Sequence, residues 1–347
     1  MGRSNFGQAE RPTTLTKQGF RTKDEAQAWA AKNTLAINSG TWVHEARGKI
    51  TIGELGQRWL SMQTHLKPST YRTTESAWRV HVKPYWGEWQ ISKIKPSDVQ
   101  HWVSSSQSGA STVRKAHDCL RQILAMAVLD GDLPTNPASG LKLPKKPKSA
   151  KTYLTIEQLQ QLADEATKHK ELIWLLGTVG LRWGEASALR VRDVNVLRRR
   201  INIEHNAVTV GKEIIIGTPK THEKRTVAVP KYVMAMIAPL LENKNPESLL
   251  WERAVGGPLP NPSFPDWYYG AVSRCMEKYE GFPYVTPHGL RHVAAGLMVS
   301  SGASVKVVQR QLGHASAAMT LDVYADLFDG DLDEVADSMD VKIRDAV

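Results

Sequence analysis

Cysteine, long apolar runs and metal-binding clusters are scarce or missing in this sequence. Only Cys119 and Cys275 occur among 347 residues, with no CxxC pair and no grouping of Cys with His. This excludes a disulfide framework and a structural zinc site, and both thiols are expected to be reduced and buried. No apolar run approaches the roughly 18 residues that span a membrane, and the N-terminus lacks the apolar centre of a secretory signal. We therefore expect a cytoplasmic protein with no membrane contact.

Acidic residues are few in the first half of the chain, so its net charge of +10 is regional. Residues 1–151 hold 23 Lys and Arg against 11 Asp and Glu, whereas residues 152–347 hold 22 against 24. Nine of those acids fall in the last 26 residues. A basic body with an acidic tail favours a polyanionic partner such as nucleic acid. Charge alone leaves this about even with a basic protein that has no such ligand.

Proline and lysine concentrate in one stretch, residues 133–151, which is typical of an extended basic linker. Residues 51–132 before it show helical spacing of apolar side chains, starting at a Thr51 cap, and predict a small helical bundle. Residues 1–48 hold a short β-like run and a helix capped by Thr22 or Asp24. Basic side chains along the bundle suit phosphate contacts, although for each one a solvated face is the better explanation. They are Lys67, Arg72, Arg79, Lys83, Arg114, Lys115 and Arg121.

Residues 152–347 are predicted to be mostly helical with one small sheet. "TIEQLQQLADEATK" and "ELIWLLGTVG" have helical patterns, and Gly180 ends the second. "RRINIEHNAVTV", "KEIIIGTP" and "RTVAVP" alternate apolar with polar residues, which predicts a three-stranded antiparallel meander with turns at Gly211 and at "KTHEK". The rest is helical, so the fold class is mostly α with a small antiparallel sheet (α+β).

Polar side chains stand at the ends of these elements, where functional residues tend to lie. In "GLRWGEASAL", Arg182 opens a helix and Glu185 is placed to hold its guanidinium group. In "TPHGLRHVAAGL", Thr286 and Pro287 favour a helix start, with His288 and Arg291 about one turn apart on one face.

Two further segments continue this pattern. Lys220 lies at a strand-to-turn junction in "GTPKTHEKRTVAV". In "QLGHASAAMTLDVYADLF", His314 follows Gly313, and Tyr324 comes ten residues later in another helix. Each residue taken alone is explained equally well by a structural role. As a set, two Arg, one Lys and two His with one adjacent acid describe a site for concentrated negative charge, and phosphate is the natural anion.

The order and spacing of "GLRWGEA", Lys220, "HGLRH", "LGHAS" and Tyr324 resemble the signature of the tyrosine recombinases, phage integrases in particular. The resemblance covers residues 51–330. It implies a SAM-like core-binding domain at 51–132, the linker at 133–151, and a catalytic domain at 152–347 ending in the acidic tail. The two domains would form a clamp around DNA. Residues 1–48 resemble the end of a module that binds arm sites, and this module looks incomplete.

The resemblance also implies a chemistry, in which Tyr324 attacks a DNA phosphodiester, forms a 3′-phosphotyrosine and releases a 5′-hydroxyl without ATP. Two arginines would bracket the phosphate oxygens, one histidine would donate a hydrogen bond, the lysine would protonate the leaving oxygen, and the other histidine would accept the tyrosine proton. In that order these residues are Arg182, Arg291, His314, Lys220 and His288. Neither a metal ion nor a cofactor is expected.

The implied partners are double-stranded attachment-site DNA and three further copies of the chain, acting through a Holliday junction in the bacterial host cytoplasm, at the nucleoid. Whether an excision factor and a host DNA-bending protein are also needed stays open. The acidic tail either packs on a neighbouring protomer or is a solvating end, with equal support. A chromosome- or plasmid-dimer resolvase and a type IB topoisomerase are alternatives of the same chemistry, and a non-catalytic DNA-binding regulator is one of another class.

Overall fold

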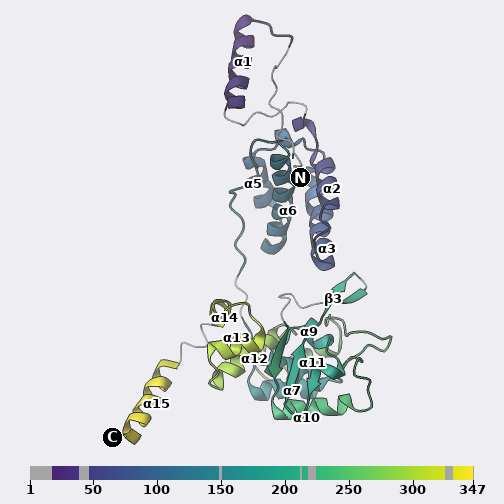
Figure 1. Ribbon diagram of the computed structural model, residues 1–347, viewed down its shortest axis with the longest axis vertical. Helices are drawn as coiled ribbons and strands as arrows, with labels where there is room; N and C mark the ends of the chain where they lie inside the picture. Colours follow the sequence, from purple (N-terminus) through teal and green to yellow (C-terminus); the bar gives the residue numbers. More distant parts are fainter. Residues whose placement is uncertain are drawn as a thin grey trace, which may run out of the picture. The chain divides into compact units, whose positions relative to one another are not determined.

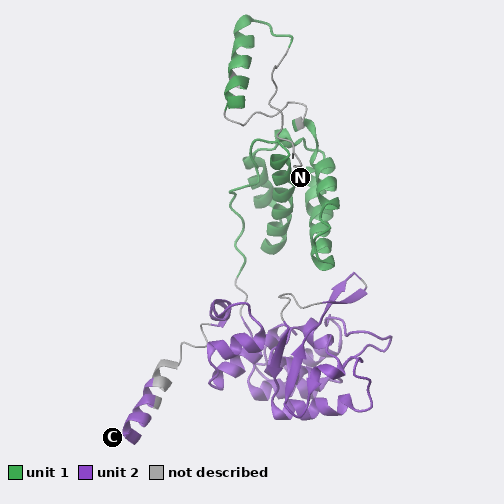
Figure 2. Cartoon of the chain, in the orientation of Figure 1, with its two compact units in different colours: residues 1–148 green, residues 149–347 purple. Residues whose placement is uncertain are grey.

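The computed structural model describes residues 18–38, 47–147, 151–211, 213–217, 224–324 and 331–346. It contains two compact units, residues 1–148 and residues 149–347 (Figure 2). Most elements are helices, and the strands form small antiparallel sheets (Figure 1), which confirms the predicted fold class. Within the described ranges, no helix combines the length and the apolar character needed to cross a membrane.

The first unit is built around a helical bundle with an aromatic core. Thr51 begins it with a capping box, in which the Thr51 hydroxyl accepts from the Glu54 amide at 3.2 Å. Trp78 packs so closely on Gly56 that a Cβ there would lie 2.2 Å from the indole ring. The bundle is the one predicted from spacing. Its elements are α2 (Ile52–Ser61), α3 (Pro68–Ala77), the π-helical η2 (Trp78–Val82), α4 (Lys83–Trp86), α5 (Pro96–Ser105) and α6 (Ala110–Leu129).

The beginning of the predicted linker packs onto this bundle. Leu133 and Ala138 are buried in its core, and His117 Nε2 donates to the Ala138 carbonyl at 2.8 Å. The Gln100 side chain pairs with both the amide and the carbonyl of Lys142, each at 3.0 Å. Arg114 Nη1 also donates to the Pro144 carbonyl at 3.3 Å, so the chain is anchored to the first unit as far as Pro144.

Ahead of the bundle, α1 (Lys23–Asn38) is the helix predicted near the N-terminus. Its start is capped by Thr22, whose hydroxyl accepts from the Glu25 amide at 3.2 Å. The β-like run predicted over residues 13–20 falls, up to residue 17, outside the described residues.

The second unit is organised around α8, which is apolar on nearly all sides and therefore buried. It packs between α12 and α7, and Leu159 of α7 sits where a Cβ of Gly177 would be only 2.6 Å away. The helices of this unit are α7 (Ile156–Glu165), α8 (Lys170–Val179), α9 (Trp183–Ser187), α10 (Lys231–Ile237), α11 (Trp267–Lys278), α12 (Gly289–Ser300), α13 (Val305–Leu312), α14 (Ala317–Tyr324) and α15 (Asp331–Ala346).

The predicted three-stranded meander is wrong in its pairing. The first run divides at Glu204 and His205 into β2 (Arg200–Ile203) and β3 (Asn206–Val210), and β3 pairs only with β4 (Glu213–Gly217). β2 instead lies between β1 (Val194–Asn195) and β5 (Arg225–Ala228). The cause is burial, because β2 and β5 place fully buried Ile and Val side chains in the core whereas β3 and β4 bury none.

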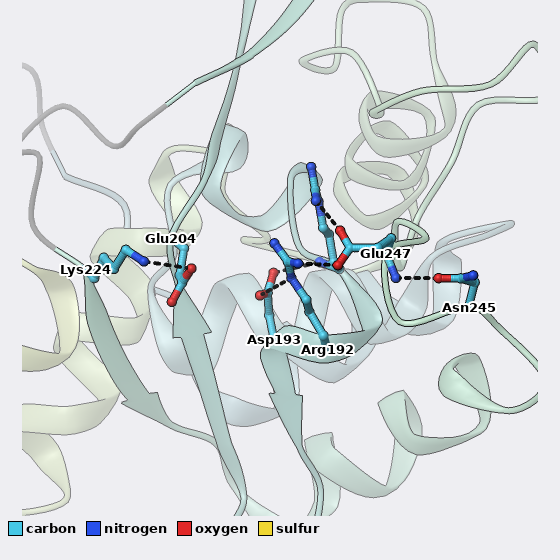
Figure 3. A network of polar contacts seen from close by, with 7 residues as sticks. Arg192, Asp193, Glu204, Lys224, Asn245 and Glu247 are labelled. Carbon is cyan, nitrogen blue, oxygen red and sulfur yellow. Dashed lines mark hydrogen bonds and ion pairs between the residues drawn. The ribbon is translucent and has the colours of Figure 1, made fainter.

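A solvent-exposed ion-pair network lies beside the three-stranded sheet (Figure 3). The Glu247 carboxylate, 54% exposed, accepts from both Arg190 and Arg192, and joins their loop to the segment before Leu249. Lys224 and Glu204 pair at 3.0 Å near the ends of β5 and β2. Exposed pairs of this kind contribute about 0–1 kcal/mol each, so the network positions loops more than it stabilises the fold.

Both cysteines are buried and unpaired, as predicted. Burial raises the pKa of the Cys119 thiol to about 12 and that of Cys275 to about 11. The two thiols are therefore protonated and unreactive at neutral pH.

Candidate active site

Arg291 joins two helix ends that are distant in the sequence. Its guanidinium group is buried, with Nη1 donating to the Gly180 carbonyl at 2.6 Å and Nη2 to the Leu312 carbonyl at 2.7 Å. Gly180 ends α8 with φ +76°, and a Cβ there would lie 2.4 Å from the Leu312 side chain. Glycine is required on both counts. The segment "GLR" at residues 180–182 and the segment "LGH" at residues 312–314 are therefore held next to each other.

Glu185 is a buried carboxylate shared by two arginines. Arg182 Nη1 donates to Oε1 at 2.8 Å, and Arg225 donates to both carboxylate oxygens, at 3.0 and 2.7 Å. Burial alone would raise the pKa of Glu185, but the hydrogen bonds and charges of Arg225 and Arg182 outweigh it and hold the pKa at about 2. The predicted contact between Arg182 and Glu185 is confirmed.

Arg225 was missed by the sequence reasoning. It opens β5, where a basic residue resembles an ordinary charge at the edge of a sheet. Its guanidinium group also lies under Gly313, where a Cβ would be 2.7 Å from Nε. Gly313 has φ +68° and directly precedes His314. Arg225 thus links Glu185 to the turn that carries His314.

His314 contacts both Thr320 and Tyr324. Its Nδ1 lies 2.9 Å from the buried Thr320 hydroxyl, and its ring stacks on Tyr324 with centroids 6.2 Å apart. Burial, together with the charges of Arg291, Arg182 and other basic neighbours, lowers the pKa of His314 to about 4. A neutral imidazole at this position can donate a hydrogen bond to an oxyanion without carrying charge.

Tyr324 is 1% exposed, and its hydroxyl lies 2.9 Å from Nδ1 of His292. Burial raises the pKa of Tyr324 to about 12, although Arg291 opposes the shift. The phenol is therefore protonated at neutral pH. Sequence reasoning missed His292, yet the signal was present, because His292 stands four residues after His288 on the same helix.

His288 lies at the exposed N-terminal end of α12. Thr286 caps this end as predicted, its hydroxyl accepting from the Gly289 amide at 3.0 Å, but the helix begins at Gly289 instead of Pro287. The His288 ring meets His292 edge to face at 5.5 Å. Arg291 was predicted on the same helix face as His288, but its side chain is buried.

His288 opens onto a cleft of about 400 Å³ beside α9 and the β3–β4 hairpin. The hairpin lies directly against α9, since a Cβ on Gly184 would be 2.3 Å from the Ala207 carbonyl oxygen. This glycine brings the hairpin within reach of the cluster at Arg182. Lys220, predicted near this hairpin, lies outside the described residues.

Four predicted residues, Arg182, Arg291, His314 and Tyr324, thus gather in one cluster, with His288 at its rim. After burial, the charge of Arg182 is the largest influence that lowers the pKa of Arg291, to about 10. The cluster thus holds three guanidinium groups and one carboxylate, which Arg182 and Arg225 bind, an arrangement suited to a multiply charged oxyanion. Within the described part of the chain, no group of three His, Cys, Asp or Glu side chains could hold a metal ion.

Comparisons with known proteins identify the family of this chain. A model of the phage integrase family matches residues 152–330, and a model of the phage integrase N-terminal SAM-like domain matches residues 51–106. The integrase of Mycobacterium phage FRAT1 is 27% identical over 319 residues, covering 86% of this chain and 92% of that protein. The transposase from transposon Tn916 of Enterococcus faecalis is 28% identical over 305 residues, covering 80% and 74%.

Two solved structures share the fold. The integrase of transposon Tn1549, in complex with a circular intermediate DNA, has a TM-score of 0.72 at 20% identity and covers 84% of this chain and 99% of that one. A lambda integrase tetramer bound to a Holliday junction has a TM-score of 0.59 at 16% identity, covering 86% and 89%.

Proposed function

This chain belongs to the phage integrase family, and we propose that it is a site-specific DNA recombinase that cuts and rejoins strands through Tyr324. The observation that carries the proposal is a cluster of three arginines next to a buried phenol, in which Arg182 and Arg225 share the Glu185 carboxylate and Arg291 lies close enough to feel their charges. Such a cluster stabilises a charged five-coordinate phosphorus. In this proposal residues 51–132 form the domain that binds the core site, and residues 152–347 form the catalytic domain that cuts and rejoins DNA. Residues 133–151 are the linker between the two.

The reaction begins when Tyr324 Oη attacks a phosphodiester. The Oη–P bond forms as the bond to the 5′ oxygen breaks, leaving a 3′-phosphotyrosine that keeps the energy of the phosphoester. Arg182 and Arg291 stabilise the non-bridging oxygens, and His314 donates to one of them as a neutral imidazole. Lys220 protonates the departing 5′ oxygen, which is too strong a base to leave without a proton. His288, at the exposed end of α12, completes the set beside the phosphate.

The partners proposed are attachment-site DNA and three other copies of the chain, which exchange strands through a Holliday junction. Solved relatives support both, since one is bound to DNA and another is a tetramer on such a junction. We place the reaction in the cytoplasm of the bacterial host, at the nucleoid, with residues 1–48 as an arm-site module.

The C-terminal helix α15 is proposed to pack on a neighbouring protomer. Met339, Val341 and Ile343 on it are each more than half exposed, and Met339 and Ile343 stand four residues apart, on one face of the helix. Truncation after Gly330 should weaken assembly of tetramers on paired sites, measured by native gel. Unchanged assembly would make the helix a solvating end.

Covalent capture tests the chemistry. Selection from a randomised duplex library gives the bound site, and a nicked version of that site traps the cleaved state as a protein–DNA adduct on a denaturing gel. Wild-type protein should form the adduct in the presence of EDTA, and Tyr324→Phe should bind the same DNA without forming it. An adduct that persists in Tyr324→Phe would refute the assignment, and no adduct with wild type would favour a non-catalytic regulator.

A second substrate tests Lys220. Lys220→Ala should cleave slowly and recover when sulfur replaces the leaving 5′ oxygen, because a thiolate departs without a proton. Equal defects on both substrates would remove Lys220 from this role.

A recombination assay with pairs of sites distinguishes an integrase from a dimer resolvase. An integrase recombines two dissimilar sites, whereas a resolvase joins identical ones.

A further inference from the structure

The hydroxyl of Tyr324 is held by His292, a residue outside the set carried over from the family signature. The two rings lie 5.6 Å apart, and the Oη to Nδ1 distance is 2.9 Å. Because Tyr324 is almost fully buried, its hydroxyl needs a hydrogen-bond partner inside the protein. His292 fills that requirement from the turn of α12 next to Arg291.

The surroundings of His292 keep its imidazole neutral. Burial, followed by the charges of His288, Lys151 and Arg291, lowers its pKa to about 4. Lys151 reaches the site from the segment before α7, with Nζ 5.6 Å from the centre of the Tyr324 ring, and the His314 ring stacks on the same tyrosine. A neutral imidazole retains a lone pair, so Nδ1 is able to accept from the phenol.

Resting on the proposed function, we propose that His292 positions Tyr324 and accepts its proton as the phenol attacks the DNA phosphate. The electron pair of the O–H bond stays on Oη and forms the bond to phosphorus, while the proton moves to Nδ1. The bond from phosphorus to the 5′ oxygen breaks, and that oxygen takes its proton from the acid already assigned, Lys220. In the rejoining step His292 returns the proton to Oη.

Binding of the DNA phosphate makes His292 a stronger base. In the free protein His292 stands among cations, which disfavour a second proton on the ring. A phosphate entering the cluster brings negative charge close to His292 and favours its protonated form. Proton transfer from Tyr324 is therefore coupled to DNA binding, and the free protein keeps its nucleophile un-ionised.

His288 is the matched control, since it stands one turn earlier on the same helix, touches His292 and is exposed. The variants are His292→Asn, whose amide oxygen replaces Nδ1 as an acceptor without its basicity, His292→Phe, which keeps only the ring, and His288→Asn. Each is compared with wild type in single-turnover cleavage of the nicked duplex between pH 6 and 9. Thermal unfolding and DNA affinity are measured alongside.

We expect wild type to cleave at a rate nearly independent of pH over this range. His292→Asn should bind DNA normally but cleave about 100-fold or more slowly at pH 7, the scale of general base catalysis. Its rate should rise about tenfold per pH unit, because the phenolate must then form without a base. His292→Phe should be slower still. His288→Asn removes a residue placed beside the phosphate, so its rate should fall as well, but its pH profile should stay flat.

A His292→Asn rate within about threefold of wild type, or a slow rate with an unchanged pH profile, overturns the inference. So does a steep profile in His288→Asn instead, which would make His288 the acceptor. If wild type forms an adduct normally, these outcomes remove only the role of His292. If wild type forms none, the proposed function fails and this role with it.

A more acidic nucleophile gives a second measurement that does not depend on the pH range or on folding of the Phe variant. Difluorotyrosine placed at position 324 should accelerate His292→Asn more than it accelerates the protein with His292 intact, because the weaker phenolic O–H replaces the missing base. Equal acceleration in both backgrounds contradicts proton transfer to His292.

Discussion

Two carboxylates in this protein are each held by two arginines, one in the core and one in water, and they make a matched test of the electrostatics of the site. Glu185 is 1% exposed and binds Arg182 and Arg225. Glu247 is 54% exposed and binds Arg190 and Arg192 (Figure 3). We compare Glu185→Gln with Glu247→Gln, because each change removes one charge and keeps the side-chain volume.

The expected losses differ severalfold. The pKa of Glu185 lies about 2.5 units below its ordinary value of 4.5, which corresponds to about 3 kcal/mol. That agrees with the roughly 3–5 kcal/mol lost when one partner of a buried ion pair is removed, since Arg182 and Arg225 then lose their shared countercharge. Glu247 is screened by water, so its replacement should cost less than about 1 kcal/mol.

Hydrogen exchange with increasing urea provides the assay, because peptides from β2 and β5 report on the second unit alone. The effect should also depend on pH. The unfolded chain binds a proton at Glu185 below about pH 4.5, while the folded protein keeps the carboxylate ionised down to about pH 2. The stabilisation is therefore complete above pH 4.5 and is lost as the pH falls toward 2. The curves of wild type and Glu185→Gln should converge there.

Equal losses in the two variants would refute this reasoning, as would a Glu185→Gln loss below about 1 kcal/mol at pH 7. A gap between wild type and Glu185→Gln that stays constant down to pH 3 would also refute it, since the effect would then come from packing instead of charge.

Three further changes test how the cluster is assembled. Gly313→Ala combines a positive φ with a Cβ 2.7 Å from Arg225 Nε, so it should lower the unfolding free energy by at least about 1 kcal/mol in urea and slow adduct formation. Gly180→Ala should have a similar effect in the same two assays, because its Cβ would lie 2.4 Å from the Leu312 side chain. Thr320→Val leaves Nδ1 of His314 without its partner and should cost about 1–3 kcal/mol in thermal unfolding, whereas Thr320→Ser should behave as wild type.

Local sequence signals predicted the ends of several helices well. Thr51, Thr155 and Thr286 each cap a helix start through a hydroxyl that accepts a backbone amide, a contact between neighbours in sequence. Gly180 and Gly313 end helices with a positive φ, as glycine at such positions predicts. These signals act over three to five residues and can therefore be read directly from the sequence.

Pairing between distant segments could not be read in the same way. Alternating residues predicted the strands, but β5 could pair with β4 or with β2, and only the burial of Ile201 and Val227 in the core decides for β2. Arg225 was missed for the same reason, because its contacts with Glu185 and Gly313 bridge 40 and 88 residues of sequence. His292 could have been predicted as a site residue without any knowledge of distant pairing, because it stands one helical turn after His288.

The charge of the assembled cluster bears on which state of the reaction it favours. The three guanidinium groups outnumber the one ionised Glu185, Lys151 adds positive charge beside Tyr324, and His292 and His314 are neutral at pH 7, so the cluster carries net positive charge. A DNA phosphodiester carries one negative charge, and the five-coordinate phosphorus formed by attack carries two. The positive cluster therefore attracts the transition state more strongly than the ground state. Interactions that strengthen only as the second charge develops accelerate the reaction, and a single buried carboxylate, bound by Arg182 and Arg225, leaves most of the positive charge of the cluster available for it.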